Sequence, residues 1–345
     1  MPVANDRSTC LSKMKRREAI GMLGVLGVST GIGRACLWDR DTLREEVLVR
    51  PTIWDLLLGQ FPHHGDVYYQ TRISRLQKAG QLEVLDLNDL AVAHVRLKEF
   101  EQAWKALNQA HKMSPDHYET LSNMGVTAKK QGDFEKGAGF ISRALAIKPE
   151  GHMGLGDWYL KALHWRAKFE DATEANPPLN NFLGDSYGGN FREKNYGGDD
   201  RAKAPPLNQR YEQLIRNDQS FADGFVLVGD ALTLVGDLHL SFVAYTRAMM
   251  LNHQHPVEVR RRRRTFLKYQ EMITRKSGMR VRGVSYWKAE IAKMEKKIQG
   301  GLNWLDQFKK VEGELVKGKS DERSVEISTV ETELKRRKIL RVTPG

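Results

Sequence analysis

The sequence predicts an all-α protein: a solenoid of antiparallel helix pairs, interrupted by a long loop and followed by a basic helical C-terminal tail. Two segments, 87–115 and 121–149, superpose when one is shifted by 34 residues. Apolar residues elsewhere in the chain recur every three or four positions, which is the helical period. A repeat of this length is a supersecondary unit that buries its apolar face only by stacking on its neighbours.

The first 36 residues differ from the rest of the chain. They carry six Lys/Arg and two Asp/Glu, and they contain both cysteines, Cys10 and Cys36. Paired arginines, Arg16-Arg17, precede a weakly apolar, glycine-rich run over 19–33, which is the order of an export signal and resembles the twin-arginine type. We predict that residues 1–35 are an export signal or anchor and that the protein is periplasmic or associated with a bacterial cell envelope, with a cytoplasmic chain as the alternative.

The stretch "GVSTGIGRAC" (27–36) has glycines spaced as in the phosphate loop of a short-chain dehydrogenase. Such a loop requires a buried strand before it and a helix after it. The sequence before Gly27 is basic and then glycine-rich, and no Tyr in the chain has a Lys four residues later, as that family would need. We therefore expect no dinucleotide, no other cofactor and no enzymatic activity.

Each repeat consists of two helices joined by a tight turn, "RLKEF" (96–100) in the first and "KQGDF" (130–134) in the second. Small residues lie where the helices cross, and a proline ends each unit. The equivalent pairs are Leu87/Leu121, Leu90/Met124, Ala91/Gly125, Phe100/Phe134, Ala103/Gly137, Ala110/Ala144 and Pro115/Pro149. This pattern resembles the tetratricopeptide repeat (TPR) at nearly every position that defines it. A third copy follows at 222–251, with equivalent positions at Phe225, Val228, Gly229, Leu238, Ser241, Tyr245 and Ala248.

About 70 residues separate the second and third repeats. Within them, 152–170 predicts a capping helix, 171–208 is rich in Gly, Asn, Asp and Pro, and 209–220 predicts a short helix. A loop as long as 171–208 is usually either mobile or functional. We divide the chain into 1–35 (signal or anchor), 36–170 (N-terminal flank, TPR pair and capping helix), 171–220 (loop and short helix), 221–256 (third TPR) and 257–345 (basic helical tail).

The N-terminal flank carries a further resemblance. The segments "CLWDRDTL" (36–43) and "FPHHGDVYYQTRISRL" (61–76) are similar to segments of a group of bacterial exported TPR proteins, which implies processing close to Cys36. A single thiol left after processing suggests a lipid anchor or an intermolecular bond, although Arg34 argues against a lipoprotein signal. Asp66 to Gln77 predicts an amphipathic helix that caps the first repeat.

The TPR resemblance implies a concave face lined by the first helix of each pair. The candidate partner-binding residues there are Asn88, Val92, Arg96, Ser122, Asn123, Val126, Lys129 and Lys130. Asn123 matches an asparagine with which family members hold a peptide backbone or carboxylate, whereas Val92 and Val126 replace the polar residues of a full carboxylate clamp. Two apolar positions and a basic end suit an extended, partly acidic segment. We predict a non-catalytic adaptor or scaffold with an unidentified protein partner; a generic solvated helix surface is the alternative interpretation.

The basic charge belongs to the ends of the chain. Residues 257–345 carry 24 Lys/Arg and 12 Asp/Glu, including the consecutive Arg260, Arg261, Arg262, Arg263 and Arg264. This run is interpreted first as a solvated helix face, next as a contact for an anionic membrane surface or acidic partner, and last as a nucleic-acid site. Nucleic acid comes last because no aromatic residues are interleaved with the basic ones. Apolar residues from Trp287 to Phe308 predict a helix, which Gly300-Gly301 would weaken.

Motifs for metal binding or catalysis are lacking. The adjacent His63 and His64 point in different directions, no His-Glu-x-x-His occurs, and no thiol lies beyond Cys36. His94 is expected to pack in the interior of its repeat. The sequence has no run of 18 apolar residues. We expect no metal ion and no small-molecule substrate.

Overall fold

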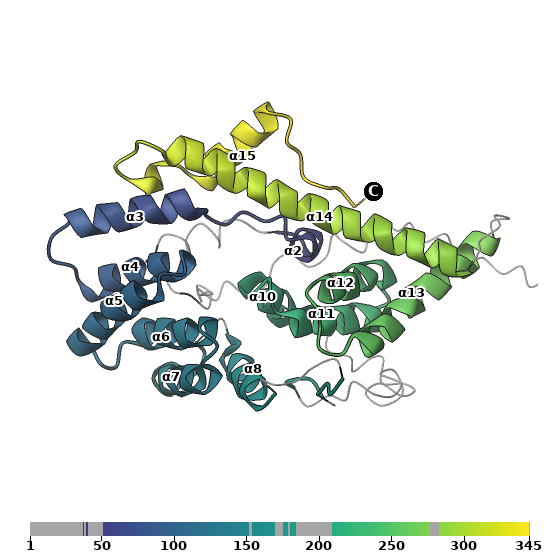
Figure 1. Ribbon diagram of the computed structural model, residues 1–345, viewed down its shortest axis with the longest axis horizontal. Helices are drawn as coiled ribbons and strands as arrows, with labels where there is room; N and C mark the ends of the chain where they lie inside the picture. Colours follow the sequence, from purple (N-terminus) through teal and green to yellow (C-terminus); the bar gives the residue numbers. More distant parts are fainter. Residues whose placement is uncertain are drawn as a thin grey trace, which may run out of the picture. The chain divides into compact units, whose positions relative to one another are not determined.

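The computed structural model describes residues 37, 39–40, 51–151, 154–169, 175–178, 180–183, 209–276 and 283–344. Its regular elements in these ranges are helices packed as successive antiparallel pairs (Figure 1), which confirms the predicted all-α helix-pair fold. The predicted signal, the glycine stretch and Cys36 lie outside the described residues. None of the described helices is long and apolar enough to cross a membrane.

The three predicted repeats are three helix pairs. They are α4 (Val84–Arg96) with α5 (Phe100–Met113), α6 (Tyr118–Lys130) with α7 (Phe134–Ile147), and α11 (Ala222–Leu234) with α12 (Leu238–Met250). A Cβ atom at Gly125 would lie 2.7 Å from side-chain carbons of Ile141 and 3.1 Å from the carbonyl oxygen of Gly137. Only glycine therefore lets α6 and α7 cross this closely, as the small residues at these positions predict.

The turn inside each repeat needs a left-handed residue. Gly132 (φ 89°) and Gly236 (φ 86°) supply it in the second and third repeats, and Lys98 (φ 62°) occupies the equivalent place in the first. The following aspartates, Asp133 and Asp237, cap the N-termini of α7 and α12. Each side chain accepts a hydrogen bond from the main-chain N–H group three residues later, at Lys136 and Leu240. The short turns force the two helices of each pair to run antiparallel.

Among the described residues, the flank and the interruption contribute α2 (Ile53–Leu58), α3 (Asp66–Lys78), α8 (Gly156–Lys168) and α10 (Gln209–Asn217). α3 is the amphipathic helix expected beside the first repeat, and it packs on α4. Part of the predicted loop is packed, because Phe182 is buried among apolar residues and the Trp165 indole donates to the carbonyl of Asn180 over 2.9 Å. Most of 171–208 lies outside the described residues.

The C-terminal region comprises α13 (Pro256–Lys276), α14 (Gly283–Val316), the 3₁₀ turn η3 (Glu322–Ser324) and α15 (Ile327–Arg336). α14 runs unbroken through Gly300-Gly301 and contacts α2, α3 and α12 (Figure 1). A Cβ atom at Gly301 would lie 2.5 Å from the carbonyl oxygen of Leu58, so this glycine lets α14 cross α2. The basic C-terminal helices therefore form part of the packed unit and connect the flank to the third repeat.

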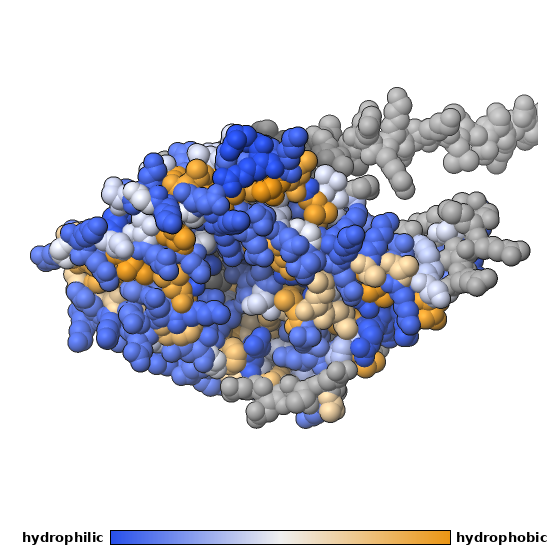
Figure 2. All heavy atoms as spheres, turned by 45° about the horizontal axis from the view of Figure 1, so that its top comes forward, coloured by the Kyte–Doolittle hydropathy of each residue, from blue (hydrophilic) through white to orange (hydrophobic). Residues whose placement is uncertain are grey.

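The surface is mainly hydrophilic on the face shown in Figure 2, with hydrophobic residues in small separated groups. Exposed large apolar side chains of the described residues are spread over several elements, among them Val67 on α3, Met113 on α5, Ile147 on α7 and Met272 on α13. These exposed apolar side chains therefore come from separate elements and are not concentrated on one helix.

Candidate partner-binding groove

The inner groove is defined here as the surface along α4 and α6 that carries the eight predicted partner-binding residues. Asn88 and Asn123 lie in it but are buried, with 0% and 1% of their surface exposed. Asn123 Nδ2 donates to Asn88 Oδ1 over 2.9 Å, and Asn88 Nδ2 donates to the Thr120 hydroxyl over 2.8 Å. The expected direct contact of Asn123 with a partner is corrected here, because these amides join α4 to α6.

The apolar part of the groove is covered by the chain itself. Val92 and Val126 are buried in one apolar cluster with Leu37, Val95 and Tyr159. Ser122 is also buried. Leu37 comes from the flank, and only 7% of its surface is exposed. The two valines predicted to contact a partner are therefore buried in a cluster that includes the chain's own N-terminal segment, which the sequence pattern did not reveal.

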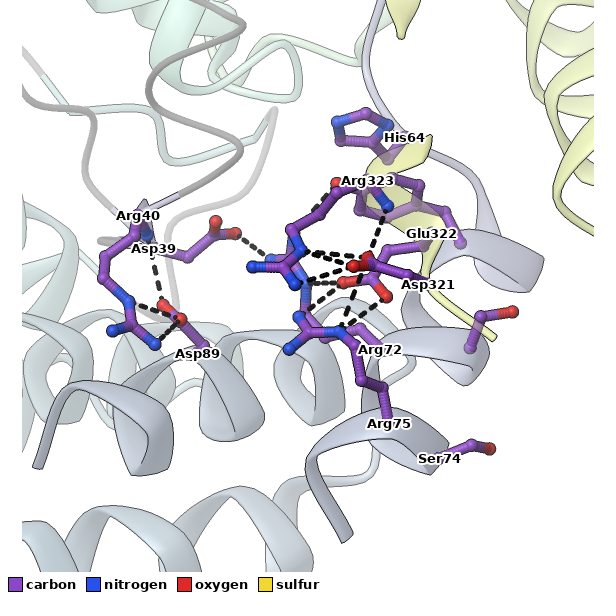
Figure 3. A network of polar contacts seen from close by, with 12 residues as sticks. Asp39, Arg40, His64, Arg72, Ser74, Arg75, Asp89, Asp321, Glu322 and Arg323 are labelled. Atoms are coloured by element: carbon purple, nitrogen blue, oxygen red, sulfur yellow. Dashed lines mark hydrogen bonds and ion pairs between the residues drawn. The ribbon is translucent and has the colours of Figure 1, made fainter. Parts of the chain in front are cut away.

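Two charged residues anchor the same segment on α3 and α4 (Figure 3). Arg40 Nε donates to Asp89 Oδ2 over 2.8 Å, its main-chain N–H donates to Asp89 Oδ1 over 3.1 Å, and its guanidinium also reaches Asp86. Asp39 Oδ2 lies 2.8 Å from Nη1 of Arg72, in an ion pair with both side chains fully buried. The segment is thus held by the burial of Leu37 and by two ion pairs. It supplies the acid in the pair with Arg72 and the base in the pair with Asp89.

Burial controls the proton affinity of these groups. Burial raises the pKa of Asp89 to about 6, the charge of Asp39 adds to that rise, and the hydrogen bonds and charge of Arg40 oppose it. Burial alone would lower the pKa of Arg72, but the charges of Asp39, Tyr68, Tyr69 and Glu322 raise it well above its ordinary value. Arg72 is therefore permanently charged, whereas Asp89 titrates close to neutral pH.

A cavity of about 240 Å³ adjoins Leu37 at the basic end of the groove. Four of the predicted residues line it: Arg96, Val126, Lys129 and Lys130. The rest of the lining consists of Leu37, Phe61, His63, Tyr159 and residues 216–220, which include the last two residues of α10. Lys129 pairs with Asp218 over 2.5 Å, and this contact lowers the pKa of Asp218 although burial opposes it. Burial and the charges of Lys309 and Arg96 lower the pKa of His63, so His63 is neutral at pH 7.

The cavity wall contains four permanent cations, Arg96, Lys129, Lys130 and Arg216, and one carboxylate, Asp218. The predicted residues thus separate into two groups. The basic ones and Val126 line this cavity, whereas the asparagines, Ser122 and Val92 are buried and do not line it. The cavity has the polarity expected for an acidic group.

A comparison with protein-family models supports the repeat assignment. The match is to the coatomer epsilon subunit family, over residues 76–152. This is a TPR-like helical family of coat subunits, not a family of enzymes, and the matched residues cover α4 to α7, which carry the groove. No curated protein and no solved structure matches the chain at the required similarity. The prediction of a TPR-type helical repeat protein is confirmed.

Helix α3, beside the first repeat, is joined to the C-terminal region by an ionic cluster that sequence reasoning missed. Arg72 Nε donates to Glu322 Oε1 over 3.1 Å, and Arg75 Nη2 donates to the same oxygen over 2.8 Å (Figure 3). Nearby, His64 Nδ1 lies 2.5 Å from Glu312 Oε1 on α14. One signal was present in the sequence, because Arg72 lies on the apolar stripe of α3 with Tyr68, Tyr69, Ile73 and Leu76.

The predicted anionic-surface residues on α13 are not all exposed. Arg261 and Arg264 are exposed and Arg260 is half-buried, whereas Arg262 and Arg263 are buried at 9% and 8% exposure. Arg262 pairs with Asp230 of α11 and, over 3.0 Å, with Glu258. The interpretation of all five as one solvated face is corrected, because successive helical residues point around the helix and α13 packs on α12.

The histidines contribute no metal site in the described ranges, where no group of three or more His, Cys, Asp or Glu side chains is arranged to hold an ion. His94 is buried at 6% exposure, as expected, and its Nδ1 lies 2.6 Å from Glu99 Oε2. His64 contacts Glu312, whereas His63 lines the cavity, so the two adjacent rings lie in different environments.

Proposed function

We propose that this protein is a non-catalytic adaptor that binds an extended, partly acidic segment of another protein at the basic end of its inner groove. The observation that carries the proposal is the cavity of about 240 Å³ beside Leu37, lined by four permanent cations and one carboxylate. Acidic side chains or a terminal carboxylate would meet complementary charge there. The likeness of α4 to α7 to a family of coat subunits supports an interaction role.

The groove also supplies an apolar contact next to these charges. Val126 and Tyr159 of α8 line the cavity, and both belong with Val92 and Leu37 to one buried apolar cluster. An extended segment offers side chains to alternate sides, so one apolar and one acidic residue can occupy neighbouring parts of this surface. The bound partner is therefore a segment rather than a folded surface.

We further propose that the protein is exported by a twin-arginine type signal in a bacterium and acts in the periplasm or at the cell envelope. The support is the order of basic, weakly apolar and small residues in 1–35. N-terminal sequencing of the chain recovered from fractionated cells tests this proposal. A mature chain starting near residue 36 in the envelope fraction is expected, and a cytoplasmic chain starting at Met1 or Pro2 would contradict it.

Adaptor binding is tested with the full-length chain and two fluorescent, unstructured peptides of equal length, one composed of Glu and Leu and the other of Lys and Leu. The acidic peptide is expected to bind in fluorescence anisotropy, and the basic one not. The Lys130→Glu/Arg216→Glu variant should weaken that binding by at least about tenfold. Lys105→Glu/Lys112→Glu, a double reversal at exposed positions on α5, is the matched control and should leave it nearly unchanged.

Two outcomes would overturn the adaptor proposal. One is equal binding of the acidic and basic peptides, and the other is an equal loss in the groove and α5 variants. Binding to anionic vesicles that is lost on Arg261→Glu/Arg264→Glu, with no peptide binding, would instead favour the alternative of an anionic-surface binder acting through α13. Steep salt dependence with DNA or RNA would favour a nucleic-acid partner.

A further inference from the structure

The segment that carries Leu37, Asp39 and Arg40 occupies the inner groove at the place where a partner is expected. Leu37 belongs with Val92 and Val126 to one buried apolar cluster. It also forms part of the wall of the basic cavity. A partner segment that extends from the cavity along the groove therefore meets Leu37 first.

The polar contacts of Asp39 and Arg40 resemble those that a protein makes with a bound peptide. Asp39 points toward Arg72 on α3, whereas Arg40 points toward Asp89 on α4 (Figure 3). The Arg40 main-chain N–H also donates to Asp89, so the contact involves backbone as well as side chain. The apolar, acidic and basic residues of the segment each meet a complementary group, on the apolar cluster, on α3 and on α4 respectively.

The surroundings permit this segment to leave. Arg72 keeps its ion pair with Glu322 and its hydrogen bond to the Tyr68 hydroxyl when Asp39 is withdrawn, so the buried guanidinium still has partners. The Arg40 side chain is 40% exposed, and its contact with Asp86 is at the surface. Water can therefore replace the Arg40–Asp86 contact at low cost, whereas loss of the contact with the buried Asp89 is the larger cost of opening.

We propose that the segment carrying Leu37, Asp39 and Arg40 is an internal ligand that closes the inner groove and that a partner segment must displace. The displacing partner presents an apolar residue in place of Leu37 and places its acidic residues in the cavity beside Lys129, Lys130 and Arg216. Closure in the isolated chain stands on the contacts above, and displacement rests on the adaptor function proposed in the previous subsection. While the internal ligand is docked, the apparent affinity for a partner is reduced by the fraction of closed molecules.

Closure is tested by the reactivity of a single thiol at position 37. The full-length chain carries Leu37→Cys together with Cys10→Ser and Cys36→Ser, and its rate of maleimide labelling is compared with that of a thiol at the exposed Lys105. Labelling at position 37 should be at least about tenfold slower, and Arg40→Asp should remove most of this protection by placing a third carboxylate beside Asp86 and Asp89. The exchange Arg40→Asp/Asp89→Arg should restore it in part, which a general loss of structure would not do. Equal labelling rates at 37 and 105 would overturn the proposal.

Displacement is tested with the acidic Glu/Leu peptide on chains that keep Leu37. Arg40→Asp should tighten its binding by at least about tenfold relative to the unaltered chain, because the open fraction increases. Arg336→Asp, which alters an exposed arginine paired with Glu333, is the matched control and should not change the peptide affinity. An unchanged affinity in Arg40→Asp would overturn displacement, whereas no peptide binding to any variant, with position 37 protected, would overturn the adaptor function and leave closure supported.

Discussion

Arg72 and Glu322, which are 250 residues apart in the chain, form a fully buried ion pair with 3.1 Å between Nε and Oε1. The pair joins α3, beside the first repeat, to the turn before α15. Burial raises the pKa of Glu322, but the hydrogen bond from Arg75 and the charges of both arginines lower it overall. The Glu322 carboxylate thus accepts from two guanidinium groups, that of the buried Arg72 and that of the half-buried Arg75.

Glu322→Gln should lower the free energy of unfolding by about 3–5 kcal/mol, because it removes one partner of a buried ion pair. Since the pKa of Glu322 is lowered by folding, its stabilisation is present above the unfolded pKa and is lost as the pH falls through the folded one. Urea unfolding at pH 7 and pH 4 measures both effects. Glu333→Gln, which breaks surface pairs with Arg336 and Arg337, is the control; an equally large loss there would contradict this account.

The arginine run makes a second prediction that separates buried from exposed members. Arg262→Ala should cost about 3–5 kcal/mol, because Asp230 is left buried with only the Tyr245 hydroxyl donating to it over 2.7 Å. Arg264→Ala should change the free energy of unfolding by less than about 0.5 kcal/mol. Chemical denaturation of both variants is the measurement. Similar stabilities for the two would mean that Arg262 is solvated in solution.

Lys98 occupies a left-handed position that the other two repeats give to glycine. Lys98→Gly removes this backbone strain, but glycine also has more freedom in the unfolded chain, which partly offsets the gain. The substitution should therefore stabilise the protein by about 0.5–1 kcal/mol. Gly132→Lys is the mirror-image control and should destabilise by a similar amount, since a Cβ atom there meets nothing within 4 Å. Thermal and urea unfolding of the two variants provide the comparison. A destabilised Lys98→Gly variant would refute the equivalence of the turns.

Asp89 should give the protein an unusual pH dependence. Burial and the charge of Asp39 raise its pKa from 3.8 to about 6, so between these values the folded chain binds the proton more tightly than the unfolded chain. Its contribution to stability therefore falls as the pH rises through this window, by up to about 3 kcal/mol.

Asp89→Asn removes that titration. The difference in unfolding free energy between the unaltered chain and this variant should decrease from pH 4 to pH 7, whereas the difference for Glu322→Gln should increase over the same range. Urea unfolding at one-unit pH intervals measures both curves. A pH-independent difference for Asp89→Asn would show that the carboxyl has an ordinary pKa in the folded protein.

Local sequence patterns determined the repeats of this protein. The 34-residue similarity, the small residues at the crossings and the apolar spacing of 66–77 depend on neighbours within about one helix pair, so they predict α3 to α7, α11 and α12. Lys98 shows the limit of that information, because only its alignment with Gly132 and Gly236 reveals the conformation it must adopt.

The tertiary structure decided which surfaces meet. Gly301 reads locally as a weak point in a helix, yet it is the place where α14 crosses the backbone of Leu58. The sequence pattern predicts an open binding surface at Val92 and Val126, yet both are buried in one cluster with Leu37. It predicts a solvated Arg262, yet Asp230 of another helix pairs with that side chain. Helical periodicity shows which face of a helix is apolar or charged. It carries no information on which distant part of the chain covers that face, because such contacts are chosen by the packing of the whole unit.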